Sequence, residues 1–212
     1  PVLQAVLDPA PHDCLAVELS SFQLHWLGPD RPASLAPFAS GLLNVEPDHL
    51  DWHGSFEAYS RDKGEVYQRT RRVCVYNVQH PLTESLLREA DVAEGCRAVG
   101  FTREAPRVGM VGVVDGVLAD RAFVEQRQSS AAELATLNDV QGDAPVLAPH
   151  QVSNALAAAT LARAAGVPPS AVRLALRGFR PDPHRIAYVD TVDEVRYVDD
   201  SKATNPPAAA AS

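Results

Sequence analysis

The stretch from Asp48 to His53 carries the densest chemistry in the sequence. It contains the metal-competent side chains of Asp48, His49, Asp51 and His53. Mg²⁺ prefers oxygen ligands, so Glu18, at the end of an apolar run, could join such a site. A metal-dependent hydrolase would use a similar cluster but usually needs further clustered histidines, and the sequence has no HxH or HExxH. The plainer interpretation is a polar loop whose side chains cap the next helix and bond the backbone.

Other polar positions also allow a functional and a plain structural interpretation. Glu18 precedes Ser20-Ser21, whose hydroxyls could line a site or simply cap a helix. Lys63 lies in a helical stretch, where a solvated lysine is the ordinary expectation. Asn154 could belong only to the polar first turn of an alanine-rich helix. The pair His184-Arg185 could be an ordinary strand edge.

The local patterns predict an α/β fold with a mostly parallel sheet flanked by helices. Apolar runs predict buried strands whose carboxyl ends carry Glu18 and Asn44, and ligands of open α/β sheets gather at such ends. The predicted strands span residues 14–19, 40–45 and 73–78. The predicted helices span residues 55–72, 82–90, 153–165 and 168–177.

Two later segments depart from this alternation of strands and helices. Between Arg97 and Gln126, short β-like pieces with turn glycines and an Asp115-Gly116 hairpin signal predict a small antiparallel addition. Pro181 breaks the chain after the helices, and we place a domain boundary there. The expected domains are residues 1–180 and 181–212; the second begins with strands at 185–189 and 195–198 and a polar loop at 199–206.

The composition is that of a globular chain and excludes some classes of partner. Hydrophobic residues make up 46% of the 212 residues and charged residues 22%, so the chain should fold around a core. The formal net charge of −8 argues against a nucleic-acid partner.

The three cysteines lack CxxC spacing, which fits a reducing cytoplasm. No apolar run reaches the roughly 18 residues of a membrane span, and nothing requires more than a monomer. Because the sequence starts without Met and stops in a run of alanines, we expect a fragment.

Taken together and in order, the polar motifs resemble those of the Mur ligase family. They are Glu18–Leu24 (ELSSFQL), Asn44–Asp51 (NVEPDHLD), His53–Ser55 with Tyr59 and Lys63, His150 with Asn154, His184-Arg185, and Asp199–Pro206 (DDSKATNP). The strings SSFQL and DSKATN are similar to those of members that add D-glutamate to UDP-N-acetylmuramoyl-L-alanine, rather than to sister Mur ligases or folylpolyglutamate synthases. The resemblance implies the central ATPase-type α/β domain and the start of a C-terminal Rossmann-like domain.

The resemblance also implies a reaction and its metal ligands. In this family ATP phosphorylates the substrate carboxylate, and the incoming amine attacks the acyl phosphate. Glu18, His49 and Lys63 would hold Mg²⁺, with His49 also near the reacting carboxylate. A lysine is cationic by default, so Lys63 would act as an N-carbamate, formed when its neutral amine reacts with CO₂.

The remaining implied roles concern the nucleotide and the amino acid. Asn154 would face adenine, Arg185 the ATP phosphates and Asp200 the ribose, while Lys202 and Thr204 would lie near the phosphates and D-glutamate. The sequence departs from the family pattern at Trp52, where arginine is usual, at Gln151, where asparagine is common, and at Ala187, where an acidic residue is usual. It also contains no G-x-x-x-x-G-K-[ST] phosphate loop. The nearest alternative is a sister Mur ligase or a folylpolyglutamate synthase, and a non-catalytic nucleotide-binding module is a further one.

Overall fold

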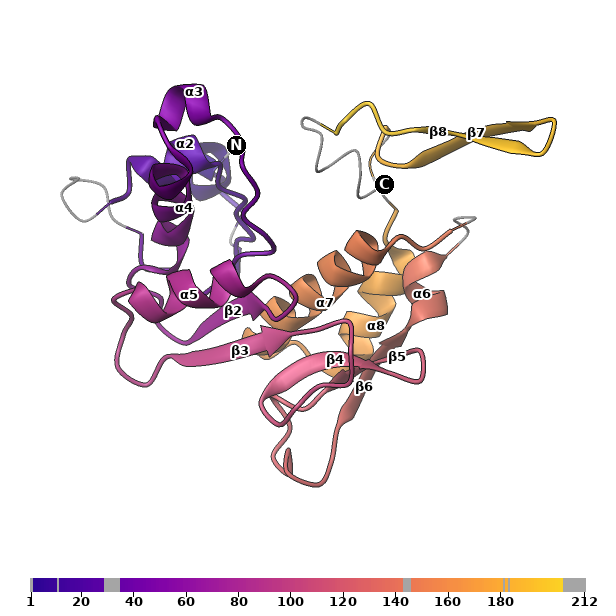
Figure 1. Cartoon of the computed structure of the whole chain (residues 1–212). Helices are drawn as coiled ribbons and strands as arrows, with labels where there is room; N and C mark the ends of the chain where they lie inside the picture. Colours follow the sequence, from indigo (N-terminus) through magenta and orange to yellow (C-terminus); the bar gives the residue numbers. More distant parts are fainter. Residues whose placement is uncertain are drawn as a thin grey trace.

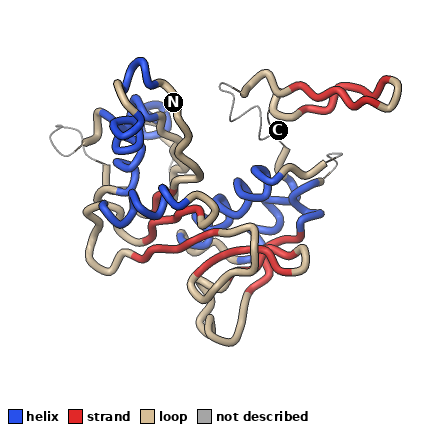
Figure 2. The backbone as a smooth tube through the Cα atoms, viewed as in Figure 1, coloured by secondary structure: helices blue, strands red, loops and turns tan. Residues whose placement is uncertain are grey.

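Six strands form one sheet whose order follows the sequence (Figures 1 and 2). The computed structural model describes residues 2–10, 12–28, 35–142, 146–180, 182 and 184–203. Strands β1 to β4 run parallel, and β5 and β6 are added antiparallel. The strands are β1 (Ala39–Gly41), β2 (Val73–Asn77), β3 (Arg97–Phe101), β4 (Met110–Val114), β5 (Val117–Asp120) and β6 (Ala132–Thr136). The predicted mostly parallel α/β fold with a small antiparallel addition is therefore confirmed.

Strand β2 shows how the sequence builds the two-sided core. All its residues are buried, and successive side chains point to opposite faces. Val73 and Val75 join one apolar cluster, which includes Leu156 of α7 (Pro149–Ala164). Cys74 and Tyr76 join the other, which lies under α5 (Pro81–Glu89). A run of apolar residues without polar alternation is what a strand covered on both faces requires.

The remaining helices are α1 (Val2–Val6), α2 (Ser21–His25), α3 (Leu50–His53), α4 (Phe56–Gly64), α6 (Leu137–Gln141) and α8 (Pro169–Gly178), with a 3₁₀ turn at Glu65–Tyr67. All are short apart from α4 and α8. Each of α2 and α6 begins with a capping box, and Ser55 caps α4 by accepting from the Ala58 N–H. At 16 residues, α7 is the longest described helix, and no described helix has the length and apolar character needed to span a bilayer.

Three predictions about the strands are wrong. Residues 14–19 form no strand and are exposed except for half-buried Leu19. They do not pair with β1, whose described neighbour is β2, and a segment without a partner strand cannot share its backbone hydrogen bonds. Strand β1 ends at Gly41, well before residue 45. The stretch from Arg97 is not antiparallel throughout, since β3 and β4 continue the parallel ladder; β6 was not predicted.

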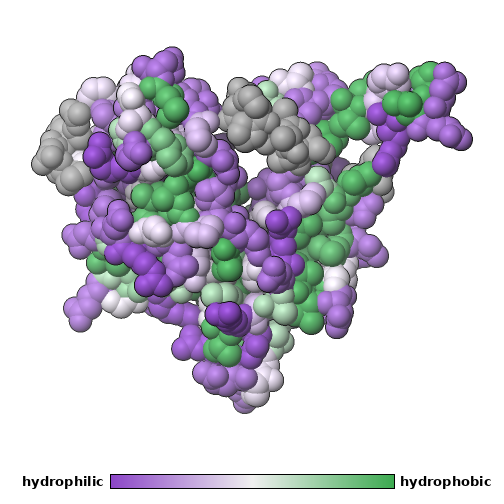
Figure 3. Space-filling view, in the orientation of Figure 1, coloured by the Kyte–Doolittle hydropathy of each residue, from purple (hydrophilic) through white to green (hydrophobic). Residues whose placement is uncertain are grey.

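The other predicted elements differ from the structure mainly at their ends. The helix expected to reach residue 72 ends at Gly64 and gives way to the 3₁₀ turn. The Asp115-Gly116 hairpin is present, with both residues at positive φ (49° and 77°) as a type I′ turn requires. A separate hairpin joins β7 (Ala187–Val192) to β8 (Val195–Asp199). Its apolar side chains are exposed, and they appear as green patches at the upper right of Figure 3.

Candidate functional site

Three segments far apart in the sequence converge at the predicted metal ligands. Helix α4 packs against both α2 and α3, and the three helices lie together in Figure 1. Glu18 lies just before α2, His49 is the residue before α3, and Lys63 lies in the last turn of α4. The fold therefore brings the predicted ligand-bearing segments to one region.

Two opposing effects act on the pKa of the Lys63 amine. The side chain is half-buried, and burial lowers the pKa of its amine, while the carboxylates of Glu18 and Asp48 act in the opposite direction. The net lowering favours the neutral amine, which is the form that reacts with CO₂. Glu18 itself is exposed, so its carboxylate is accessible to a ligand.

The position of the His49 ring depends on its backbone conformation and on contact with an aromatic neighbour. Its φ is 51°, which is a left-handed conformation at the start of α3. Its ring lies 4.8 Å from that of Phe22, and its Nε2 lies 3.6 Å from Oδ2 of Asp48. The imidazole is 46% exposed, so it can reach a metal ion or substrate.

His53 occupies a different environment from His49. Its side chain is 0% exposed, with Nε2 3.0 Å from Ser21 Oγ and Nδ1 2.7 Å from Asp62 Oδ2. Both ring nitrogens are engaged, so His53 has none left for a metal ion. The hydrolase interpretation, which used His53 as a ligand, is therefore not supported. Ser21, His53 and Asp62 form a serine–histidine–carboxylate chain, but Ser21 is only 4% exposed and no substrate can reach it.

The donor set fits magnesium only when Lys63 contributes oxygen. Within the described residues, no three His, Cys, Asp or Glu side chains form a group that could hold a metal ion. Glu18 supplies carboxylate oxygen and His49 supplies imidazole nitrogen. A carbamate on Lys63 would add the anionic oxygen that is missing, and oxygen is the ligand type that Mg²⁺ prefers.

The predicted nucleotide residues lie in two parts of the fold. Asn154 is exposed in α7, whereas Arg185 and Lys202 are exposed at the base of the β7–β8 hairpin. There, Oδ1 of Asp200 accepts from the Ile186 N–H at 3.2 Å. Thr204 lies outside the described residues. The nucleotide roles of these residues stay predictions.

Two residues of the motifs named above, His184 and Asp199, meet at the base of the hairpin. Nδ1 of His184 lies 2.6 Å from Oδ2 of Asp199. Hydrogen bonds from His184 and Ser201 hold the pKa of Asp199 at about 2. This contact joins the segment before β7 to the end of β8. His184 directly precedes Arg185, and Asp199 directly precedes Asp200.

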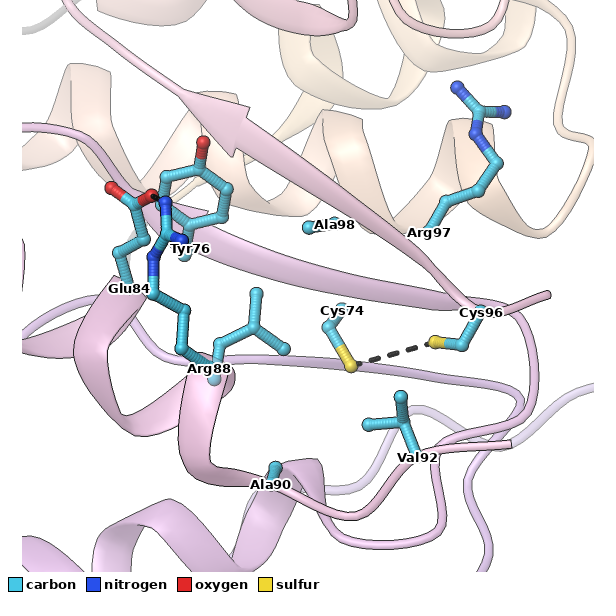
Figure 4. Close-up of a pocket in the computed structure, with 10 residues that line it drawn as sticks. Cys74, Tyr76, Glu84, Arg88, Ala90, Val92, Cys96, Arg97 and Ala98 are labelled. Carbon is cyan, nitrogen blue, oxygen red and sulfur yellow. Dashed lines mark hydrogen bonds and ion pairs between the residues drawn. The ribbon is translucent and has the colours of Figure 1, made fainter. Parts of the chain in front are cut away.

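The described surface also has hollows away from these residues. One of about 390 Å³ lies between α5 and strands β2 and β3, and no predicted site residue lines it (Figure 4). Its lining includes Cys74, Glu84, Arg88 and Cys96, with the two sulfur atoms 3.7 Å apart.

Comparison with solved structures places this fold among the Mur ligases. MurF from Acinetobacter baumannii matches with a TM-score of 0.55 and 19% identity over 83% of this chain and 36% of that chain. MurF ligase from Thermotoga maritima, solved in complex with ADP, matches with a TM-score of 0.54 and 18% identity over 82% of this chain and 38% of that chain. The family described as the Mur ligase middle domain matches residues 2–162. The chain belongs to the Mur ligase family, as the ordered motifs predicted.

Close sequence relatives are D-glutamate ligases. The UDP-N-acetylmuramoylalanine--D-glutamate ligase of Streptomyces avermitilis is 59% identical over 211 residues, covering 100% of this chain and 43% of the relative. The enzymes of the same name from Streptomyces coelicolor and Leifsonia xyli are 56% and 49% identical, again over 100% of this chain and over 43% and 41% of their own lengths. The chain thus spans about two fifths of the length of the curated relatives it matches.

Sequence reasoning missed the residues that connect the three segments. Asp62 and His25 gave no motif signal, yet Oδ2 of Asp62 receives hydrogen bonds from both His53 and His25. The only available signal was the position of Asp62 immediately before Lys63, and position alone does not reveal which side chain it meets.

Proposed function

We propose that this chain is the central part of an ADP-forming ligase that joins D-glutamate to UDP-N-acetylmuramoyl-L-alanine in peptidoglycan precursor synthesis. Relatives of that name, similar along the whole chain, support the substrate assignment. The observation that carries the chemistry is the half-buried Lys63 amine, whose pKa burial lowers and the nearby carboxylates of Glu18 and Asp48 raise, with Asp48 also 3.6 Å from the exposed His49 imidazole.

In this proposal, Glu18, His49 and N-carbamylated Lys63 hold Mg²⁺. The ion would neutralise charge as the carboxylate of the substrate meets the γ-phosphate of ATP. Lys63 contributes by losing its positive charge, which burial promotes and which removes the repulsion between an ammonium group and the metal. The imidazole of His49 is exposed, so it can also orient the reacting carboxylate.

The nucleotide and amino-acid contacts belong to the same proposal. Asn154 would contact adenine, Arg185 the phosphates and Asp200 the ribose, with Lys202 and Thr204 beside the phosphates and D-glutamate. After helices α7 and α8 the chain changes sharply to the exposed β7–β8 hairpin, which supports domains at 1–180 and 181–212. The second would be the start of a Rossmann-like domain. The enzyme would work in the cytoplasm as a monomer, on small-molecule substrates and without nucleic acid or membrane partners.

Phosphate release tests the reaction directly. The full-length ligase carrying this chain would be supplied with ATP, Mg²⁺ and UDP-N-acetylmuramoyl-L-alanine, and with D-Glu, L-Glu, L-Ala, L-Lys or diaminopimelate in separate assays. We expect release with D-Glu alone. Release with another amino acid would indicate a sister ligase, and no release with any of them would contradict the ligase proposal.

The lysine role has its own prediction, because Lys63 and Lys202 are the only lysines in the sequence. With ¹³C-labelled bicarbonate and Mg²⁺, the 212-residue chain should show a carbamate ¹³C signal that Lys63→Arg removes. Lys202→Arg is the matched control and should keep the signal. In the full-length ligase, Lys63→Ala should lower kcat at least about 100-fold, because one ligand of the metal that stabilises the transferring charge is lost. A persistent carbamate signal in Lys63→Arg would contradict this assignment.

A further inference from the structure

A buried hydrogen-bonded chain connects the three segments that carry the proposed metal ligands. It runs from Ser21 Oγ to His53 Nε2 at 3.0 Å, and from His53 Nδ1 to Asp62 Oδ2 at 2.7 Å. Nδ1 of His25 meets the same carboxylate oxygen at 3.0 Å. An ionised carboxylate only accepts hydrogen bonds, so both imidazoles donate to Asp62. In a neutral His53, Nε2 then accepts from the Ser21 hydroxyl.

Each member of this chain lies close in sequence to a proposed ligand. Ser21 lies three residues after Glu18, His53 ends the helix that His49 precedes, and Asp62 directly precedes Lys63. Helices α2 and α3 span only 5 and 4 residues, and helices this short are not stable without tertiary contacts. The hydrogen bonds of His53 are therefore a main restraint on the relative positions of these segments.

The surroundings of His53 hold its ring in one orientation. The ring lies 4.5 Å from that of Trp52 and 5.2 Å from that of Tyr59, both in edge-to-face geometry. Asp62 is turned toward the two imidazoles, whereas the carboxylates that act on Lys63 are those of Glu18 and Asp48. The carboxylate of Asp62 is thus engaged by the two imidazoles.

We propose that His53 is a positioning residue that sets the distances among Glu18, His49 and Lys63 for metal binding and carbamate formation. The inference rests on the proposed function of these residues. Groups that hydrogen-bond to metal ligands typically contribute about 10- to 100-fold in metal affinity, and His53 acts through Ser21 and Asp62, which are close in sequence to the ligands. His53 acts through two hydrogen bonds and does not touch the metal or the substrate.

The test compares His53→Phe, His53→Asn and a control in the full-length ligase. Phenylalanine keeps a ring but loses both hydrogen bonds, while the asparagine amide can still donate to Asp62. The readouts are Mn²⁺ affinity by electron paramagnetic resonance and the ¹³C carbamate signal that depends on Lys63. We expect His53→Phe to weaken Mn²⁺ binding about 10- to 100-fold and to reduce the carbamate signal in parallel. His53→Asn should recover most of both.

Arg163→Met controls for general loss of stability. Arg163 forms an ion pair with buried Asp120 at 2.8 Å, away from the proposed ligands. This variant should lower the melting temperature and leave Mn²⁺ affinity unchanged. If His53→Phe does not fold, Ser21→Ala removes a single hydrogen bond with little change in volume and should weaken Mn²⁺ binding several-fold.

The outcomes separate this inference from the function on which it rests. Wild-type affinity and carbamate signal in folded His53→Phe, or in Ser21→Ala where His53→Phe does not fold, would overturn the positioning role while leaving the proposed ligase intact. An equal loss of affinity in Arg163→Met would also overturn it, because the effect would then be one of general stability. A wild-type protein with neither Mn²⁺ binding nor a carbamate signal would instead overturn the proposed metal site, and the positioning role with it.

Discussion

At the scale of single residues, burial determines the chemistry of Cys74. Its side chain has no exposed surface, and burial raises the pKa of the thiol from 9.0 to about 12. An unfolded chain would ionise this thiol near pH 9, while the folded protein keeps it protonated. The contribution of the Cys74 thiol to the free energy of unfolding is therefore fully present below about pH 9 and is lost as the pH rises toward 12.

This environment predicts a difference between two cysteine variants above pH 9. The free energy of unfolding of the wild type should fall more steeply with pH than that of Cys74→Ala, by up to about 1.4 kcal/mol per pH unit. Urea unfolding at pH 7.5, 9 and 10 measures this. Cys14→Ala, at an exposed position, should keep the slope of the wild type. Equal slopes in the wild type and Cys74→Ala would show that the thiol ionises alike in both states.

At the scale of elements, β4 depends on a glycine under an overlying loop. A Cβ on Gly112 would collide with the backbone carbonyl of Glu104 and would lie 2.8 Å from Thr102 Cγ2. The loop is also hydrogen-bonded to this strand, since the Val113 N–H donates to the Glu104 carbonyl at 2.9 Å. A side chain at Gly112 must therefore move backbone rather than a flexible side chain.

Gly112→Ala should accordingly destabilise the fold by roughly 1–3 kcal/mol, as overpacking does in other cores. The midpoint of urea unfolding measures the effect. Gly178→Ala is the matched control, because a Cβ there meets open space at the end of α8. It should lie within about 1 kcal/mol of the wild type or be more stable. A neutral Gly112→Ala would mean that the loop is free to move away from β4.

At the scale of the whole molecule, the proposed activity needs more than this chain contains. The sequence has no G-x-x-x-x-G-K-[ST] motif to bind the phosphates of ATP, and its relatives are more than twice its length. We predict that the 212-residue chain alone forms no ADP in response to D-glutamate, while the full-length ligase does. A coupled ADP assay checks this, with circular dichroism to establish that the shorter chain is folded. ADP formation by that folded chain would contradict the prediction.

The sequence by itself determined the elements whose signals are local. Unbroken apolar residues predicted β2, Asp115-Gly116 predicted the β4–β5 turn, and the Ser20-Ser21 pair offered a helix cap, which Ser20 supplies. These elements depend on residues within a few positions of one another. The order of the polar motifs along the chain also indicated the family.

Only the tertiary structure decided which distant residues meet. The apolar run at residues 14–19 looked like a strand, but it remains unpaired because a strand needs a neighbour to share its backbone hydrogen bonds. Strand β3 joined the parallel ladder, although its local pattern suited a hairpin equally well. His53 looked like a metal ligand until Ser21, 32 residues away, and Asp62, 9 residues away, occupied both ring nitrogens. Spacing identifies side chains able to do chemistry, but the packing of short helices decides which of them remain available for it.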